Sequence, residues 1–290
     1  MKPPPFTYHR PETREEVDAL LSTYGPEAKI LAGGQSLVPI LNMRLASPRH
    51  IVDINHLRDE NDEPEVVGDD VLCGPLVRQE AVERSQTVSD RLPLLAEAIG
   101  YVAHAAIRNR GTVVGSVAHA DPAAELPAVL VALGGTVEAR RAGSRRRIAA
   151  ADFFVGPLEN SMGDDEWTDG VRLPARRPGE GFAFAEFARR SGDYALCGVA
   201  AAVRGDNGHR SLTLSFLGMG DAPVALDAGA LDDGFVSGSG IEDAIVEITS
   251  ALEAGDDIHA TPEYRRWLAH KLGVRAARTA WDRAGGGNER

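Results

Sequence analysis

Apolar residues recur with two different spacings along this chain, one typical of strands and one typical of helices, and the order of these spacings divides the chain into two parts. Short strand-like runs alternate with helical periods in the first part, whereas the part after residue 181 begins with strands alone. These strands, with a hairpin turn at 206–208, predict a three-stranded antiparallel sheet, and helices follow near 241–254 and 262–281. The fold class expected is therefore α+β. The three strand-like segments are 182–190, 197–204 and 209–218.

A stretch without any apolar period, residues 174–181, marks the expected domain boundary. Two arginines, a proline and a glycine follow one another there, a composition typical of an exposed linker. A polar, acidic connection after residue 57 divides the first domain again. The expected units are subdomains at about 1–57 and 58–175, a second domain at 181–284 and a loose tail at 285–290.

The first local signal is a glycine turn between a strand and a helix. Lys29–Ala32 reads as a short buried strand and Gly33-Gly34 as the turn, and a helix runs from Leu37 to about Leu45 with Ser36 at its N-cap. Two adjacent glycines leave no Cβ in the turn, so a ligand can reach the backbone, whose N–H groups favour a phosphate. The alternative is a purely structural turn. A further strand completes a β-turn-α-β unit of parallel-sheet type.

A second candidate binding segment spans residues 107–127. It is long for a connection and poor in regular pattern, which is typical of binding loops. We expect it to end in a helix with Asp121 as N-cap and Pro122 at the first helical position, which gives a second possible anion site. Glu125 is four residues from Asp121, so both carboxylates are expected on one face, in reach of ligand hydroxyl groups.

Composition and charge exclude several classes of function. The formal net charge of −12 disfavours nucleic acid as the main ligand. Only two cysteines, Cys73 and Cys197, are present, too few for an iron–sulfur cluster or a zinc site, and we expect both to be buried, inert thiols. No apolar run is long enough to span a bilayer and no signal peptide is recognisable, so the expected location is the cytoplasm.

No self-sufficient catalytic site is recognisable in the sequence. The eight histidines lack metal-ligand spacing, and no serine lies in a nucleophile elbow. His104 and His119 flank the second loop, but a lone histidine is more often a hydrogen-bonded structural residue than a catalyst, so a structural role is favoured for both. What remains is a pair of glycine-bearing loops at helix starts, which two linked phosphates of a dinucleotide would satisfy, although neither loop has a Rossmann or P-loop signature.

Three ordered motifs carry a resemblance to a known family. They are Ala32–Leu37, Arg108–Pro127 and the Arg-Arg-Ser-Gly-Asp-Tyr-Ala segment at 189–195. Together they resemble the FAD-binding medium subunit of molybdenum hydroxylases such as carbon monoxide dehydrogenase and xanthine dehydrogenase, from about Phe6 to Trp281. The resemblance implies a PCMH-type FAD-binding domain of two subdomains and a C-terminal domain of the carbon monoxide dehydrogenase flavoprotein type.

The resemblance also implies a function and a set of partners. FAD on this chain would take electrons from the [2Fe–2S] clusters of a small subunit and pass them to an external acceptor. A large molybdopterin subunit would oxidise the substrate, so carbon monoxide, a purine, another N-heterocycle or an aldehyde cannot be chosen from these residues. The expected assembly is a dimer of heterotrimers. The alternatives are a stand-alone FAD-dependent reductase or oxidase, and a non-redox nucleotide-binding assembly module.

The family pattern also implies the residues of the FAD site. The first loop and Thr112–Ser116 would hold the pyrophosphate, and Glu125 would contact the FAD. The backbone at Leu173 would lie beside the flavin ring, and Tyr194 would shield the face of that ring. Two departures stand out: Val114 replaces a glycine, and so needs a negative φ or strain, and Glu186 stands where some members have a lysine. The implied site residues are Leu31, Ala32, Gly33, Gly34, Gln35, Ser36, Leu37, Val102, Thr112, Val114, Gly115, Ser116, Asp121, Glu125, Leu173 and Tyr194.

Overall fold

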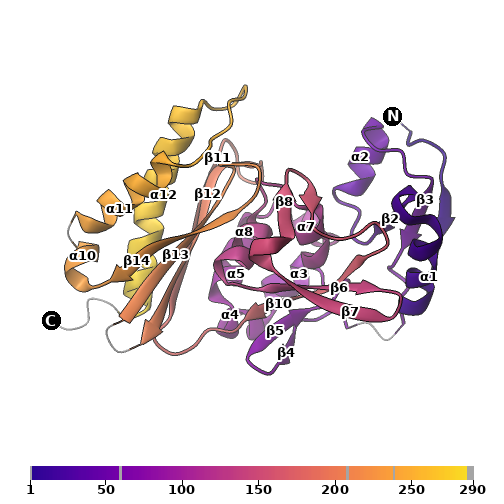
Figure 1. Ribbon diagram of the computed structural model, residues 1–290, viewed down its shortest axis with the longest axis horizontal. Coiled ribbons are helices and arrows are strands. Elements are labelled where there is room, and N and C mark those ends of the chain that lie inside the picture. The colour runs from indigo at the N-terminus through magenta and orange to yellow at the C-terminus, as the bar shows by residue number, and fades with distance from the viewer. Residues whose placement is uncertain (1, 59–60, 207–208, 238, 286–290) are drawn as a thin grey trace.

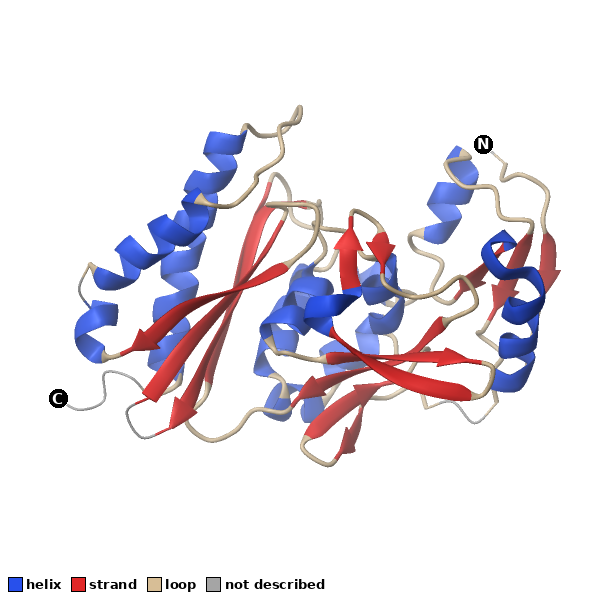
Figure 2. Cartoon of the chain, in the orientation of Figure 1, coloured by secondary structure: helices blue, strands red, loops and turns tan. Residues whose placement is uncertain are grey.

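Three groups of strands and helices lie in a row along the molecule in the computed structural model (Figure 1). The structure describes residues 2–58, 61–206, 209–237 and 239–285. An N-terminal lobe with a three-stranded sheet comes first, followed by a five-stranded sheet with helices and then by a four-stranded sheet with helices. Helices cover one face of the middle sheet and the outer face of the C-terminal sheet (Figure 2).

The N-terminal lobe contains the predicted β-turn-α-β unit. Its sheet has the order β1-β3-β2, and both pairings are parallel, as expected. Thr13 caps the first helix by accepting a hydrogen bond from the Glu16 N–H at 3.2 Å. The elements are β1 (Thr7–His9), α1 (Arg14–Tyr24), a 3-10 turn η1 (Gly25–Glu27), β2 (Ala28–Leu31), α2 (Leu37–Met43) and β3 (His50–Asp53).

The middle part is built on an antiparallel sheet of order β4-β5-β10-β6-β7, with a small β8-β9 pair beside it. Its strands are β4 (Glu65–Val67), β5 (Asp70–Cys73), β6 (Thr136–Arg141), β7 (Ser144–Ala149), β8 (Phe154–Gly156), β9 (Glu159–Asn160) and β10 (Trp167–Pro174). Its helices are α3 (Gln79–Arg84), α4 (Gln86–Arg91), α5 (Pro93–Ala98), η2 (Ile99–Tyr101), α6 (Ala105–Arg108), α7 (Val113–His119), α8 (Glu125–Ala132) and α9 (Ala150–Phe153).

The C-terminal sheet has four strands, so the expectation of three was wrong. The additional edge strand, β14, is rich in alanine and contains Gly229 at φ +83°, so the sequence carries a weak strand signal there. Asn207 and Gly208 of the expected hairpin turn lie outside the described residues, as does the expected tail beyond Gly285. The elements are β11 (Gly181–Ala188), β12 (Ala195–Asp206), β13 (His209–Leu217), β14 (Val224–Leu231), α10 (Asp233–Ser237), α11 (Gly240–Ser250) and α12 (Pro262–Arg283).

The two faces of this sheet bury different cores. Phe182 and Phe184 of β11 turn toward the middle part, where α5 and α8 pack against the sheet. Ala183 and Ala185 turn the other way, toward α12. The strict alternation follows from the two-residue period of a strand. The C-terminal sheet therefore joins the middle part through a continuous apolar contact.

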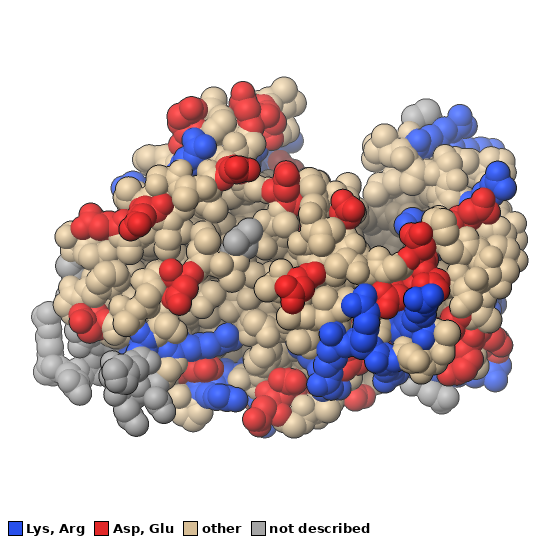
Figure 3. All heavy atoms as spheres, viewed as in Figure 1, with Lys and Arg blue, Asp and Glu red and all other residues tan. Residues whose placement is uncertain are grey.

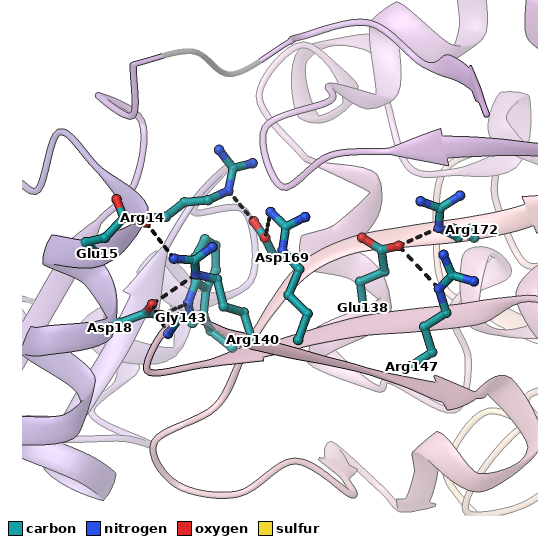
Figure 4. Close-up of polar contacts among 11 residues, drawn as sticks. Arg14, Glu15, Asp18, Glu138, Arg140, Gly143, Arg147, Asp169 and Arg172 are labelled. Carbon is teal, nitrogen blue, oxygen red and sulfur yellow. Dashed lines mark hydrogen bonds and ion pairs between the residues drawn. The ribbon is translucent and has the colours of Figure 1, made fainter.

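A network of ion pairs joins the N-terminal lobe to the middle sheet (Figure 4). Arg140 of β6 donates to Asp18 of α1 at 2.9 Å and to Glu15 at 2.8 Å, and Asp18 also accepts from the Trp167 indole N–H at 2.9 Å. Asp18 is 4% exposed, so its charge is buried together with its partners. Removing one partner of such a group leaves an uncompensated charge, so the network fixes where the lobe sits.

Candidate functional site

The first glycine turn leaves three consecutive backbone donors without a partner. The N–H groups of Gly34, Gln35 and Ser36 make no hydrogen bond within the described residues. Gly34 has φ +72°, a conformation that glycine adopts without strain. Ser36 stands at the N-cap of α2, as expected, but its hydroxyl makes no capping hydrogen bond to the described chain. Three N–H groups and one hydroxyl can therefore donate to a ligand.

The first turn lies directly against the second loop. A Cβ on Gly33 would overlap the carbonyl oxygen of Arg110 and lie 2.8 Å from the Cα of Gly111. Both neighbouring atoms are backbone, so neither can rotate away. Gly33 is therefore required for the contact between the two loops, whatever binds there.

Two side chains that the sequence did not single out hold this contact in place. The Asn55 amide donates to the carbonyl of Ala32 at 2.8 Å, and Arg78 donates to Asn55 at 2.6 Å and to the carbonyl of Arg110 at 2.5 Å. Asn55 thus orients one loop and Arg78 spans both. Their partners lie more than 20 residues away in sequence, so no local pattern could reveal them.

The second loop segment, expected to be poor in regular structure before residue 121, contains a helix of its own. Helix α7 begins at Val113, and Thr112 caps it by accepting from the Gly115 N–H at 2.9 Å. Val114 lies inside the helix and is not among the residues with positive φ, so it carries no left-handed strain. The N–H of Val113 donates to Val77, and Ser116 donates to the Thr112 carbonyl.

The free donors of this second loop are consequently few. Of the N–H groups of residues 113–116, only that of Val114 lacks an acceptor in the described chain. The Thr112 hydroxyl has a proton left to donate, but Thr112 is only 2% exposed. Ser116 is half-buried. The first turn offers a ligand more hydrogen bonds than the second does.

Helix α8 starts three residues later than the sequence suggested. It begins at Glu125, with Ala124 at the N-cap, so Asp121 is not a helix cap and Pro122 is not the first helical residue. Asp121 instead closes a local turn by accepting from the Ala123 N–H at 2.9 Å. Such side-chain turns compete with helix formation, which explains the later start.

Glu125, Asp121 and Tyr194 act on one another electrostatically and form an acidic corner. Glu125 is 8% exposed, and burial, with a smaller contribution from the charge of Asp121, raises its pKa to about 7. The pKa of the Tyr194 phenol is also raised, by burial of part of the side chain and by the two carboxylates, although the residue as a whole is 73% exposed. A hollow of about 530 Å³ opens here, lined by Asp121, Tyr194 and Arg265. The acidic corner therefore joins two of the sequence motifs.

The third motif also touches the approach to α6. A Cβ on Gly192, which has φ +82°, would lie 2.5 Å from Nδ1 of His104. Arg108 is fully engaged close by: it makes a two-pronged ion pair with Glu83, at 2.9 and 2.8 Å, and donates to the carbonyl of Val102 at 2.9 Å. His104 and Arg108 therefore pack and tie the loops, which agrees with the structural reading of His104.

The remaining predicted residues lie in the supporting framework. Leu31 ends β2, and its carbonyl accepts from Ile54 at 3.0 Å, while Leu37 opens α2. Val102 follows η2 and is 8% exposed. Leu173 is 2% exposed and pairs with Val71 in the β10–β5 ladder. No hydrogen bond in the described part of the chain joins Leu173 to either glycine loop.

The two loops come from two different parts of the molecule. In Figure 1, α2 belongs to the N-terminal lobe and α7 to the middle part. The space-filling view shows a notch between the lobe, at the upper right, and the rest of the protein (Figure 3). An elongated ligand that touches both loops would therefore bridge the two parts.

Thiols, possible metal ligands and possible membrane-spanning helices were each considered among the described residues. Cys73 and Cys197 are both buried, as expected, and burial raises the pKa of each thiol to about 12, so neither is a reactive thiolate at neutral pH. Among residues 2–58, 61–206, 209–237 and 239–285, no group of three His, Cys, Asp or Glu side chains is placed to hold a metal ion. None of the described helices combines the length and the apolarity that a membrane crossing requires.

Comparison with known proteins places the chain in a family. A family model described as "FAD binding domain in molybdopterin dehydrogenase" matches residues 4–176, and a second, "CO dehydrogenase flavoprotein C-terminal domain", matches residues 182–280. The nicotine 6-hydroxylase medium subunit of Paenarthrobacter nicotinovorans is 39% identical over 279 residues, which cover 94% of this chain and 96% of that subunit.

Solved structures agree with the sequence comparison. A chain of the carbon monoxide dehydrogenase from Hydrogenophaga pseudoflava superposes with a TM-score of 0.89 at 32% identity and covers 98% of this chain and 99% of its own. A chain of a Cu,Mo-CO dehydrogenase has a TM-score of 0.90 at 28% identity, with 98% and 100% coverage. This chain therefore belongs to the FAD-binding medium subunits of the molybdenum hydroxylase family, which are subunits of oxidoreductase complexes.

Proposed function

We propose that the chain holds one FAD with its pyrophosphate at the first glycine turn, and that it passes electrons from partner-borne [2Fe–2S] clusters to an external acceptor. The observation that carries this proposal is the run of three unpartnered N–H groups at Gly34, Gln35 and Ser36. Donors that find no acceptor in the protein favour an anionic ligand, and a pyrophosphate offers several oxygens.

The residues present fit the cofactor. Glycines at 33 and 34 keep Cβ atoms away from the turn, and Asn55 and Arg78 hold the turn against the second loop before a ligand arrives. Preorganised donors lose little entropy on binding. The second loop adds the Val114 N–H and the Ser116 hydroxyl, so we assign it the smaller share of the pyrophosphate contacts.

Each predicted residue then has a distinct task. FAD, when bound, supplies one- and two-electron chemistry at its isoalloxazine ring, and the chain positions and shields that ring. Glu125 would accept hydrogen bonds from the FAD, Leu173 would present its backbone beside the ring, and Tyr194 would cover one face. Val102 and Leu37 would line the approach. A ring held under Tyr194 is sheltered from oxygen.

The partners follow from what this chain lacks and from its relatives. Its two cysteines are too few for a [2Fe–2S] cluster. The relatives include a protein named as a medium subunit and a chain from a Cu,Mo-CO dehydrogenase. We therefore infer a small iron–sulfur subunit and a large molybdopterin subunit, assembled as a dimer of heterotrimers, with FAD bound by residues 1–175 and the second domain at 181–284.

The FAD site is tested by titrating the apo chain with FAD. Gly34→Val should abolish binding, because a Cβ there would lie 3.1 Å from Cδ1 of Leu31 and 3.2 Å from Cγ2 of Val38 and so displace the turn whose N–H groups hold the pyrophosphate. Gly68→Val is the matched control: Gly68 has φ +66°, close to the +72° of Gly34, but no atom lies within 4 Å of its Cβ position. Both variants carry the same backbone strain, so only a steric effect at the site separates them. Equal FAD affinity of the two folded variants would refute the placement.

Electron transfer needs a second experiment. Addition of reduced iron–sulfur subunit to the FAD-loaded chain should bleach the flavin absorbance, and an external acceptor should restore it. A flavin that binds but is never bleached would favour the non-redox assembly module.

A further inference from the structure

Helix α2 is apolar on nearly every side, but the rest of the described chain covers little of it. Six of its seven residues, Leu-Val-Pro-Ile-Leu-Asn-Met, are apolar, yet Leu41 is the only one of them that the structure shows as buried. A helix that is apolar all round is normally enclosed by protein. Val38 and Met43 are exposed, and Leu45, two residues beyond the helix, is 74% exposed. The described chain by itself therefore leaves this helix without a covering surface.

An aromatic side chain extends this apolar surface onto the sheet beside the helix. Parallel crossover connections are right-handed, and β1–α1–β2 and β2–α2–β3 cross the sheet in opposite directions, so α1 and α2 lie on opposite faces. Val52 points into the core that includes α1, so Ile51 and its strand neighbour Tyr8 point to the side of α2. The exposed Tyr8 ring is held in place, because its hydroxyl donates to Asp53 at 2.5 Å. We call the α2 surface the patch formed by Tyr8, Val38, Met43 and Leu45.

The surroundings of this patch are positively charged, although the whole chain has a net charge of −12. Residues 1–11 and 28–52 contain five Lys and Arg residues and no Asp or Glu. Both stretches border α2, because Arg44 at the end of the helix donates to the Lys2 carbonyl at 3.3 Å. All five cations are exposed, and as far as the structure describes the chain only Arg49 forms an ion pair, with Glu27 at 3.6 Å. Figure 3 shows Lys and Arg atoms at the top of this lobe.

We propose that the α2 surface docks the iron–sulfur subunit through a face that has an apolar centre and an excess of carboxylates around it. The choice of this occupant among the inferred subunits rests on the proposed function. Aromatic residues and Met are enriched at the centres of protein interfaces, and complementary charges around them speed association. A stable interface covers about 800 Å² on each partner. Four side chains provide less than this, so the contact also includes the positively charged surroundings.

The position of α2 next to the FAD turn selects the iron–sulfur subunit as the occupant. The Val38 N–H donates to the Gly34 carbonyl at 3.1 Å, and the Ile40 N–H donates to the Ser36 carbonyl at 3.2 Å, so the helix and the turn form one unit. A subunit seated on α2 lies beside the N–H groups assigned to the pyrophosphate. Of the inferred partners, the one that delivers electrons to FAD has to come closest to the cofactor.

Protection of an introduced thiol from a maleimide identifies the occupant. Cys73 and Cys197 are buried, so the thiol of a Met43→Cys variant reacts without competition from them. Added iron–sulfur subunit should slow the labelling of Met43→Cys about tenfold or more. Val246→Cys is the matched control, because Val246 lies on α11 and is 50% exposed, against 53% for Met43. Its labelling should not change.

The same assay separates the iron–sulfur subunit from other occupants. Failure of the iron–sulfur subunit to protect Met43→Cys overturns the proposal. Protection by the large subunit alone, or by vesicles of phosphatidylserine, assigns the surface to a different partner and also overturns it. Protection that grows with the concentration of this chain alone would show self-association, with the same consequence.

Affinity measurements test the apolar centre and the charges separately. Met43→Glu should weaken binding of the iron–sulfur subunit about tenfold or more, because the interface would enclose an unpaired charge, whereas Val246→Glu should bind as the wild type does. Lys29→Glu should weaken binding mainly at low salt, and Lys271→Glu on α12 is its control. Equal affinities of folded Met43→Glu and Val246→Glu overturn the proposal.

Neither measurement requires bound flavin, so the two proposals can fail independently. A chain that binds no FAD but is protected at Met43→Cys refutes the FAD placement alone. A chain that binds FAD but is not protected by the iron–sulfur subunit refutes the docking surface alone.

Discussion

Gly33→Ala tests whether contact between the two glycine loops organises the FAD site. The added Cβ would lie 2.8 Å from the Cα of Gly111 and overlap the Arg110 carbonyl. An ordinary carbon–carbon contact is about 3.5 Å, so the loops must separate by about 0.7 Å or more. The same movement disturbs the 2.5 Å hydrogen bond from Arg78 to that carbonyl.

This displacement has two measurable consequences. Overpacking of this kind costs about 1–3 kcal/mol of folding stability. Loss of one charge-assisted hydrogen bond to the pyrophosphate costs about 1.5–3 kcal/mol, which weakens FAD binding by about 10- to 100-fold.

FAD affinity is measured by titrating the apo chain and following quenching of flavin fluorescence, with thermal unfolding recorded in parallel. Gly100→Ala is the matched control, because no atom lies within 4 Å of a Cβ at Gly100 and its φ is not positive. A folded Gly33→Ala variant that binds FAD as tightly as Gly100→Ala would refute the reasoning that this contact shapes the site.

Three further substitutions test the shielding of the flavin by Tyr194, the protonation of Glu125 and the ion-pair network around Asp18. Tyr194→Ala should retain FAD but reduce oxygen faster; an unchanged oxidase rate would remove its shielding role. Burial raises the pKa of Glu125 from 4.5 to about 7. The folding stability of the wild-type chain is therefore fully present below about pH 4.5, where Glu125 is neutral, and is partly lost as the pH rises through about 7. Urea unfolding should therefore find apo Glu125→Gln more stable than wild type by about 3 kcal/mol at pH 8, but equal at pH 4.5; a gain at both pH values would contradict this. Asp18→Ala leaves buried Arg140 with only Glu15 as its partner and leaves the Trp167 N–H without an acceptor, so a loss of about 3–5 kcal/mol is expected, and a loss below about 1 kcal/mol would show that the network is dispensable.

Local patterns predicted those parts of the site whose causes are local. The glycine turn before α2 and Ser36 at the N-cap follow from neighbouring residues, and both are confirmed. Asp121-Pro122 shows where such reasoning fails, because the same two residues suit a helix start and a side-chain turn. Competition between these two structures is settled by packing, which one sequence does not display.

Contacts between residues distant in sequence determine the parts of the fold and of the site that local patterns did not predict. Asn55 and Arg78 orient the loops through partners distant in sequence, and the close approach of Gly33 to Gly111 exists only once the lobe is docked. The fourth strand of the C-terminal sheet was missed because β14 has few β-branched or aromatic residues and gains its stability from pairing with β13. Val114 was expected to be a possible source of strain in a turn, whereas helix α7 accommodates it.

The central claim is that this chain is the FAD-carrying subunit of a larger molybdenum hydroxylase. Purification of the native protein, with its flavin, metal and subunit content measured on the same sample, tests this claim most directly. The account predicts one FAD per chain, together with a molybdenum-bearing large subunit and an iron–sulfur small subunit. Recovery of the chain alone, colourless and without molybdenum or iron, would contradict it.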